Sequence, residues 1–197
     1  MSSYHIYKQT RDAAWRFLID NNITSLPLSF SDICRANNIK LLRYIGNDYF
    51  ADDERGITFI KDGQYNIIVN GADSLQVQRY TMGHELGHIF LGHLQNGQMH
   101  TRISGTRADP KAPMEYQAER FAMGILAPAC VLWGLDLHSP KDIAKVCYIS
   151  IEDARYRADR MRDLYKRDVF LASELEKRVF KQFKSFVETK KAPLAGA

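Results

Sequence analysis

The residues of this sequence best suited to chemistry are two histidines and a glutamate in the stretch His84-Glu85-Leu86-Gly87-His88. On a helix, residues four apart share one face with Cβ atoms about 5–6 Å apart, so His84 and His88 can bind the same cation. Glu85 is offset from that face and is well placed to take a proton from water as a general base. The pattern predicts the components of metal-assisted hydrolysis. The alternative is an amphipathic helix on which two histidines share a stripe by chance.

A third ligand must come from a second element, because a catalytic zinc site commonly has three protein ligands and one open position. Residues 114–128 have apolar side chains at helical spacing and predict a helix that ends at Pro128. Glu115 and Glu119 lie four residues apart on one side of this helix. One of them can bind the metal while the other orients a ligating histidine.

With these motifs the chain resembles the ImmA/IrrE family of metallopeptidases, a gluzincin-like group. The resemblance extends from about Asp12 to Leu164, and its other motifs are Leu26-Pro27, Phe30-Ser31-Asp32-Ile33, Ile67-Ile68-Val69-Asn70, Arg79-Tyr80-Thr81 and Ile149-Ser150 with Arg155. In that family the first glutamate of the later helix binds zinc, which implies Glu115 as the ligand, 27 residues after His88. Glu119 falls where relatives usually have Asn or Asp, and the resemblance implies that it orients a ligand.

The resemblance implies a zinc-dependent endopeptidase that binds one Zn²⁺ through His84, His88 and Glu115 and uses Glu85 as the base. Similar proteins often act in transcription regulation as anti-repressors: they cleave a helix-turn-helix repressor and release genes of a mobile element or a stress response. A second class of function stays open, namely a non-catalytic, zinc-stabilised module that binds a repressor, a toxin or DNA. In such a module Glu85 would be dispensable and the ligands would not.

The group that would stabilise the oxyanion during peptide hydrolysis is not selected by spacing. Tyr80, His100, Tyr116 and Tyr148 are all candidates. Residues 95–113 predict a long connection without regular structure, and such loops are often functional, so this one could form a wall of the cleft.

The composition is that of a globular protein of 197 residues, with 45% hydrophobic and 25% charged residues. The net charge is +4, and residues 162–197 carry the surplus, with nine Lys or Arg against five Asp or Glu. A solvated helix face explains this surplus better than a nucleic-acid patch, so direct nucleic-acid binding is not favoured.

The cysteines and the N-terminus indicate the cytoplasm. Cys34, Cys130 and Cys147 are widely spaced and form no C-x-x-C pair, which favours buried thiols in a reducing compartment. The sequence shows neither the apolar segment of a signal peptide nor a run of membrane-spanning length. We therefore expect no membrane association.

The elements that would position the metal ligands predict a mostly helical α+β, zincin-like domain over residues 1–136. Residues 39–45 predict a strand, and residues 57–60 and 65–69 predict a hairpin around Asp62-Gly63. Together they predict a small three-stranded antiparallel sheet against the metal-binding helix. The hairpin could supply the edge strand that takes an extended substrate, and a purely structural hairpin is an equal alternative.

The metal-binding helix itself should begin after Asp73 or Ser74 as the cap and end near residue 91. Gly83 and Gly87 each lower helix propensity by about 1 kcal/mol relative to Ala, which suggests close approach of another backbone or a substrate. His93 follows Gly92 and should turn away from the ligand stripe, as a surface or helix-end histidine without metal contact.

Residues 137–197 predict a helical region packed on the first domain. Ser139-Pro140 and Ser150 have the sequence of helix starts, and the two helices that they begin have the spacing of a helix-turn-helix. Helical packing is favoured over DNA binding, because acidic residues interrupt the arginines of the second helix. Residues 170–187 predict a terminal amphipathic helix that packs on this region or on a partner.

Overall fold

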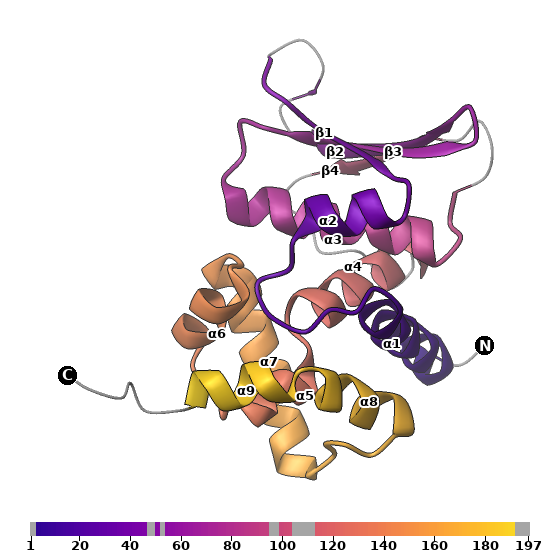
Figure 1. Cartoon of the computed structure of the whole chain (residues 1–197). Coiled ribbons are helices and arrows are strands. Elements are labelled where there is room, and N and C mark those ends of the chain that lie inside the picture. Colours follow the sequence, from indigo (N-terminus) through magenta and orange to yellow (C-terminus); the bar gives the residue numbers. More distant parts are fainter. Residues whose placement is uncertain (1–2, 47–49, 52–53, 95–98, 104–112, 192–197) are drawn as a thin grey trace. The chain divides into compact units, whose positions relative to one another are not determined.

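The computed structural model describes residues 3–46, 50–51, 54–94, 99–103 and 113–191, the backbone alone at 3–4 and 99–103 (Figure 1). Its contacts divide the chain into two units that alternate along the sequence. Unit 1 comprises Met1–Ala13 and Ser29–Met123, and unit 2 comprises Ala14–Leu28 and Gly124–Ala197. Two helices, α1 (Ser3–Asp20) and α4 (Pro113–Leu126), run from one unit into the other. The predicted domain boundary after residue 136 stays a prediction.

Unit 1 contains a mixed sheet with the strand order β1-β3-β2-β4. The strands are β1 (Lys40–Tyr44), β2 (Glu54–Lys61), β3 (Gln64–Asn70) and β4 (Met99–Ile103). The predicted hairpin is confirmed as β2 and β3, and its two turn residues, Asp62 and Gly63, have φ angles of 51° and 74°. Positive φ at both central residues is what a type I′ turn requires, and the Asp-Gly pair adopts it at low cost.

The fold class is the predicted mostly helical α+β, but the sheet has four strands where three were predicted. Strand β4 lies within the stretch that was expected to be a connection, and its residues pair with residues of β2 that are 40 to 49 positions earlier. Strand β1 pairs with β3 in parallel, not antiparallel. The hairpin strands are both interior, so the prediction that the hairpin supplies an edge is wrong. The edges of the described sheet are β1 and β4.

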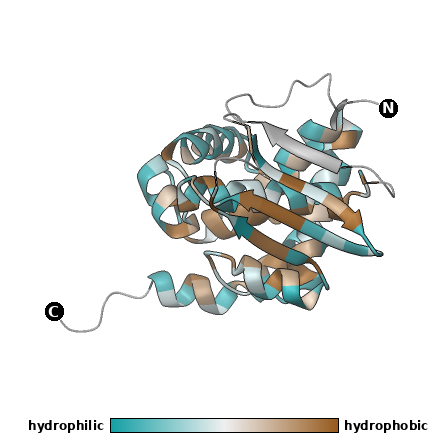
Figure 2. Cartoon of the chain, turned by 90° about the horizontal axis from the view of Figure 1, so that it is seen from above, coloured by the Kyte–Doolittle hydropathy of each residue, from teal (hydrophilic) through white to brown (hydrophobic). Residues whose placement is uncertain are grey.

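Helix α3 (Leu75–Phe90) packs on one face of this sheet. Its cap is Ser74, whose hydroxyl accepts a hydrogen bond from the backbone N–H of Val77 at 3.3 Å. The helix approaches β2 at Gly56, where an added Cβ would collide with the side-chain methyl of Thr81. The interior strands are apolar along much of their length, as Figure 2 shows for the sheet seen from above. Gly56 therefore allows α3 to lie directly against the sheet.

The other face of the sheet has its own apolar cluster. Ile57 and Ile68 are paired across β2 and β3 and are buried together with Phe50. Tyr44 and Phe59 are partly buried against them. Both faces of the central strands are thus covered, which fits their continuous runs of apolar residues.

Unit 2 is helical in its described residues. Its helices besides the ends of α1 and α4 are α5 (Ala129–Gly134), α6 (Pro140–Cys147), α7 (Ile151–Arg167), α8 (Glu174–Gln182) and α9 (Lys184–Lys191). The predicted caps are confirmed, since Ser139 accepts from the N–H of Asp142 and Ser150 from that of Asp153. The predicted terminal helix over 170–187 is instead two helices, α8 and α9, separated at Phe183.

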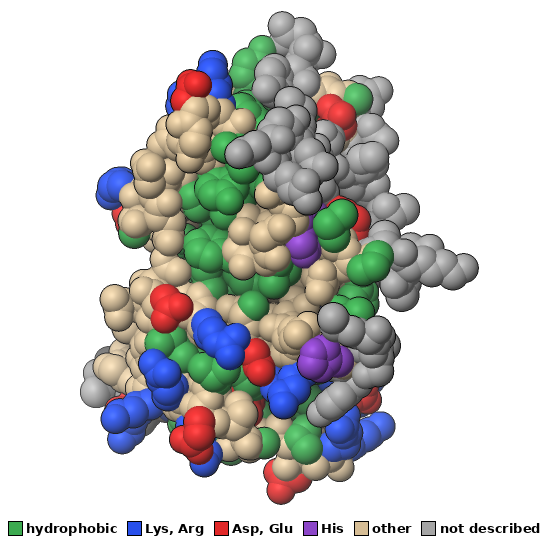
Figure 3. Space-filling model, turned by 90° about the vertical axis from the view of Figure 1, so that its right-hand side faces the viewer, with side chains coloured by type: hydrophobic (Ala, Val, Ile, Leu, Met, Phe, Trp, Pro, Cys, Tyr) green, Lys and Arg blue, Asp and Glu red, His purple; other side chains and the backbone are tan. Residues whose placement is uncertain are grey.

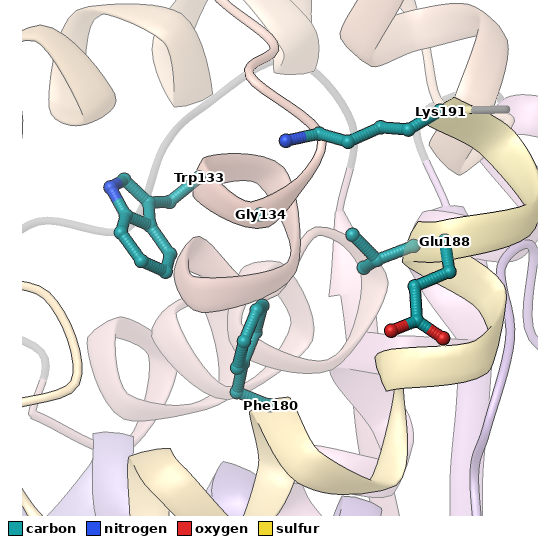
Figure 4. Close-up of a pocket in the computed structure, with 6 residues that line it drawn as sticks. Trp133, Gly134, Phe180, Glu188 and Lys191 are labelled. Atoms are coloured by element: carbon teal, nitrogen blue, oxygen red, sulfur yellow. The ribbon is translucent and has the colours of Figure 1, made fainter. Parts of the chain in front are cut away.

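Aromatic packing holds α5 and α8 together in unit 2. The ring of Trp133 lies 5.5 Å from that of Phe180 and 5.6 Å from that of Phe170, measured between centroids. A pocket opens beside this contact (Figure 4), lined by Trp133, Gly134, Phe180, Val187, Glu188 and Lys191. None of the predicted site residues lines it. No helix in the described part of the chain combines the length and the apolar character that a bilayer crossing requires.

Candidate metal centre

Two of the predicted ligands lie one helical turn apart in α3 and are almost fully buried. His84 and His88 each expose 1% of their surface. Their Nε2 atoms lie 3.0 Å apart, so both rings present the same nitrogen to one point. This convergence is the outcome that the four-residue spacing predicts for a helix.

The third predicted ligand comes from the first turn of α4. One carboxylate oxygen of Glu115 lies 3.3 Å from Nε2 of His84, and the other lies 3.5 Å from Nε2 of His88. Two ligands of a tetrahedral zinc ion with bonds of about 2.0–2.1 Å are about 3.3 Å apart. The three donor atoms therefore have the separations of a tetrahedral face, and the chemistry of the donor set fits zinc.

The site is closed on the histidine side and open on the glutamate side. The side chains of His84 and His88 are 2% and 1% exposed, whereas that of Glu115 is 37% exposed. A structural zinc site would have four protein ligands and no open position. Among the described residues, His84, His88 and Glu115 are the group whose atoms could hold a metal ion. Three ligands with an exposed side are what a catalytic site requires.

A glycine in α3 sets the distance between the two helices that carry the ligands. A Cβ added to Gly87 would lie 3.0 Å from Cα and 3.1 Å from the carbonyl oxygen of Ala118 in α4. The expectation of close backbone approach is thus confirmed at Gly87. Because Ala118 is one turn after Glu115, this contact holds the third ligand near the two histidines.

Glu85, the predicted base, is completely buried. Its side chain extends toward β2, since a Cβ added to Gly56 would lie 3.8 Å from Cγ of Glu85. The carboxylate is thus carried by the helix that carries the histidines, on the side of the sheet. Strand β2 lies next to the edge strand β4. Glu85 therefore faces the strand that neighbours this edge of the sheet.

The paired glutamate on α4 and the four candidates for oxyanion stabilisation lie at different places in the chain. Glu119 is half-buried on α4, one turn after Glu115, and its predicted role in orienting a ligand stays a prediction. Tyr80 is buried, and Tyr116 is half-buried with the guanidinium of Arg120 4.8 Å from its ring centre. Tyr148 belongs to unit 2, at the turn between α6 and α7. The side chain of His100 lies outside the described part of the chain.

One residue of the site was misjudged from the sequence. His93 lies at the end of α3 as expected, but its ring contacts that of His88, with the centroids 5.0 Å apart. A histidine directly after Gly92, five residues beyond a ligand, was the signal that could have predicted this contact. The expectation that His93 would turn away from the site is wrong in this respect.

The three cysteines are free and buried, in agreement with the sequence-based prediction. Burial raises the pKa of the Cys34 thiol from 9.0 to about 11. Burial, followed by the charge of Glu176, raises the pKa of Cys130 to about 12, although Arg157 opposes this rise. Both remain protonated thiols near neutral pH, which excludes Cys34 and Cys130 as thiolate nucleophiles there.

Comparison with known protein families gives a match over more than half of the chain. The family model described as the IrrE N-terminal-like domain, Peptidase_M78, matches residues 45–159, which is 159 − 45 + 1 = 115 of the 197 residues. The matched segment includes His84, Glu85, His88 and Glu115. No curated protein matches the chain.

Proposed function

Because this chain belongs to the IrrE N-terminal-like peptidase family, we propose that it is a zinc-dependent endopeptidase with its ion bound by His84, His88 and Glu115. The observation that carries the proposal is the triangle of donor atoms, with sides of 3.0, 3.3 and 3.5 Å. Zinc is favoured over harder cations because two of the three ligands are imidazoles.

The chemistry divides between the ion and the protein. A bound zinc ion supplies Lewis acidity toward the scissile carbonyl and the attacking water. Glu85 takes a proton from that water and then returns it to the leaving amine as a general acid. The ligands stay fixed throughout because His84 and His88 are packed inside the helix interface.

The substrate would enter as an extended segment beside β4. This strand is an edge of the described sheet. No other described strand pairs with its outer side, and an edge strand presents backbone N–H and C=O groups there. An added strand would gain main-chain hydrogen bonds there, next to β2 and Glu85. By resemblance, we propose that the protein substrate is a helix-turn-helix repressor of a mobile element or a stress response. The three buried free thiols suit action in a reducing compartment such as the cytoplasm.

Intact-mass analysis tests this proposal directly. A candidate repressor encoded beside this gene is co-expressed with the wild-type chain and with Glu85→Gln, which removes the base and spares the ligands. Fragments with the wild type alone would support a peptidase and identify the cleaved bond. An intact repressor that co-purifies with both forms would contradict cleavage and favour the non-catalytic, zinc-stabilised module. A repressor that is neither cut nor bound would overturn its assignment as the substrate.

Direct DNA binding through α6 and α7 receives less support. The two helices do form a tight helix-turn-helix, with Tyr148 in the left-handed conformation between them. However, α7 carries Glu152, Asp153 and Asp159 among its basic residues. In the lower part of the face drawn in Figure 3, which does not label α6 or α7, acidic and basic side chains are likewise interspersed. DNA affinity that falls steeply with salt would be the evidence for this alternative.

A further inference from the structure

The two ring nitrogens of His88 face different surroundings. Its Nε2 faces the site, 3.0 Å from Nε2 of His84 and 3.5 Å from an oxygen of Glu115. Its Nδ1 lies on the opposite side of the ring, 3.2 Å from Nδ1 of His93. The second nitrogen of His93, Nε2, lies 3.1 Å from Oε1 of Gln117 on α4. A continuous chain of polar atoms therefore leads from the candidate ligand His88 to the helix that carries Glu115.

The end of α3 has the geometry that brings His93 back toward His88. Gly92 has a φ angle of 72°, a left-handed conformation that costs glycine little. The backbone N–H of His93 donates to the carbonyl of His88 at 2.9 Å, and that of Gly92 donates to Ile89 at 3.1 Å. These two bonds form a Schellman motif, with Gly92 as the first residue beyond the cap. The motif reverses the chain, and the ring of His93 reaches the outer nitrogen of the ligand.

The protons of this chain have one consistent arrangement when Nε2 of His88 binds a cation. A neutral imidazole that ligates through Nε2 carries its proton on Nδ1, so His88 must donate to Nδ1 of His93. His93 then accepts at Nδ1 and carries its own proton on Nε2, which donates to Oε1 of Gln117. Each donor of this chain meets an acceptor, and the two distances of 3.2 and 3.1 Å allow both hydrogen bonds to form at once.

We propose that His93 and Gln117 are positioning residues that fix the tautomer and ring orientation of His88 for metal binding. The inference rests on the proposed function, because it assigns the metal to the Nε2 side of His88. His93 acts through the ligand and does not touch the metal or the substrate. Hydrogen-bond partners of this kind also raise the basicity of a ligating imidazole, and their loss commonly weakens metal affinity 10- to 100-fold.

The same chain of hydrogen bonds connects the two ligand-bearing helices. His93 is at the end of α3, and Gln117 lies two residues after Glu115 on α4. The contact of Gly87 with Ala118 sets how closely these helices approach. The bond from His93 to Gln117 adds a directional constraint on α4. We therefore expect that loss of either residue changes the zinc site and not only the stability of the fold.

Zinc affinity of the purified full-length chain, measured by competition with a chromophoric chelator, tests the inference without a substrate. His93→Ala should weaken zinc binding about 10- to 100-fold. His93→Asn should restore most of the affinity, because the Asn Oδ1 can accept from Nδ1–H of His88. The matched control is His138→Ala, since the Nε2 of His138 also lies 2.9 Å from a polar side chain, that of Asp136, in unit 2. It should bind zinc like the wild type.

Nuclear magnetic resonance of the imidazole nitrogens gives a second readout that a purely structural contact would not change. In the zinc-loaded wild type, His88 should carry its proton on Nδ1 and His93 on Nε2. Gln117→Leu removes the final acceptor, and we expect a several-fold loss of zinc affinity and a changed tautomer balance at His93. This variant also carries the test if His93→Ala does not fold.

The inference would be overturned by wild-type zinc affinity in both His93→Ala and Gln117→Leu, or by a proton on Nδ1 of His93. Failure of the proposed function has a different signature. A wild-type chain that binds zinc and cleaves nothing would contradict the peptidase and leave these affinities measurable. A wild-type chain without zinc affinity would overturn both.

Discussion

Each unit of the chain buries a glutamate, and the two carboxylates have different surroundings. Glu85 in unit 1 is 0% exposed and Glu176 in unit 2 is 4% exposed. Glu176 lies in the first turn of α8, where its carboxylate accepts a hydrogen bond from the N–H of Ala172 at 3.0 Å. In return, the hydroxyl of Ser173 accepts from the N–H of Glu176 at 3.2 Å. This reciprocal pair closely resembles a capping box, so burial of Glu176 is explained by helix capping.

Glu85 occupies a different place in its helix. It lies more than one turn from either end of α3, next to His84 in the sequence and three residues before His88. A glutamate is rarely fully buried in a protein, and this one lies on the helix that carries the two candidate histidine ligands. The comparison shows that burial alone does not identify a functional glutamate. The place of the residue has to be considered as well: Glu176 takes part in a helix cap, and Glu85 lies beside the candidate metal ligands.

The largest expected effect separates the two glutamates by activity. Glu85→Gln keeps the size of the side chain and removes the base, so the rate of substrate cleavage should fall about 10²- to 10⁴-fold. Glu176→Gln should leave the cleavage rate of the folded protein unchanged. Cleavage assays with zinc at saturation and calorimetric unfolding of both variants make the measurement.

In thermodynamic stability the order of the two variants should be reversed, with the larger loss in Glu176→Gln. We expect Glu176→Gln to lower the free energy of unfolding by about 1 kcal/mol, because a neutral amide oxygen accepts the hydrogen bond from Ala172 less strongly than a carboxylate does. Glu85→Gln should change it less. Equal loss of activity in both variants would show that the functional distinction between the two glutamates is wrong.

Removal of the metal should destabilise unit 1 more than unit 2. Zinc bound only by the folded state at 1,000 times its dissociation constant stabilises that state by about 4 kcal/mol. The ligands all belong to unit 1. Chelation should therefore increase amide hydrogen exchange in α3 and α4 far more than in α7, as mass spectrometry of peptides would show. A uniform increase across both units would indicate that the chain unfolds as one cooperative body.

Two glycines provide a smaller and matched test. A Cβ at Gly87 would meet the backbone of Ala118, and a Cβ at Gly124 would lie 2.8 Å from Cβ of Ala14. Each substitution by alanine overpacks a buried contact and should lower the free energy of unfolding by about 1–3 kcal/mol. Only Gly87→Ala should also weaken zinc binding, because it moves α4 and Glu115. Equal zinc affinity in both variants would argue against the role of Gly87 in spacing the ligands.

The features predicted correctly from the sequence are those that local chemistry determines. The caps at Ser74, Ser139 and Ser150 depend on a side chain that reaches the N–H three residues later. The turn at Asp62-Gly63 depends on two positive φ angles that these residues tolerate. Convergence of His84 and His88 follows from the pitch of a helix. None of these requires knowledge of a distant segment.

The features that were missed depend on distant pairing. Residues 99–103 form strand β4 because their backbone pairs with that of β2. These residues have no strong alternation of apolar and polar side chains that would have predicted a strand. The parallel pairing of β1 with β3 is likewise decided by the path of the chain. The contact of His93 with His88 required recognition of the Schellman motif at Gly92. The interruption at Phe183 was missed because the apolar spacing continues through both α8 and α9.

The smallest expected effect compares a buried thiol in each unit. Cys34 in unit 1 has its pKa raised to about 11 by burial, and Cys130 in unit 2 to about 12. The folded state favours the protonated thiol at both sites. This contribution to stability is fully present below the usual pKa of 9.0 and is lost as the pH rises through about 11 for Cys34 and about 12 for Cys130.

Alkylation of the native protein measures this difference, because the thiolate is the reactive form. With iodoacetamide at pH 8, neither thiol should react appreciably while the chain is folded. As the pH is raised, Cys34 should become modified before Cys130, as peptide mass spectrometry would show, with the denatured chain as the control for full reactivity. Equal rates at every pH would mean that both thiols react through global unfolding, and that the two units do not protect their cysteines independently.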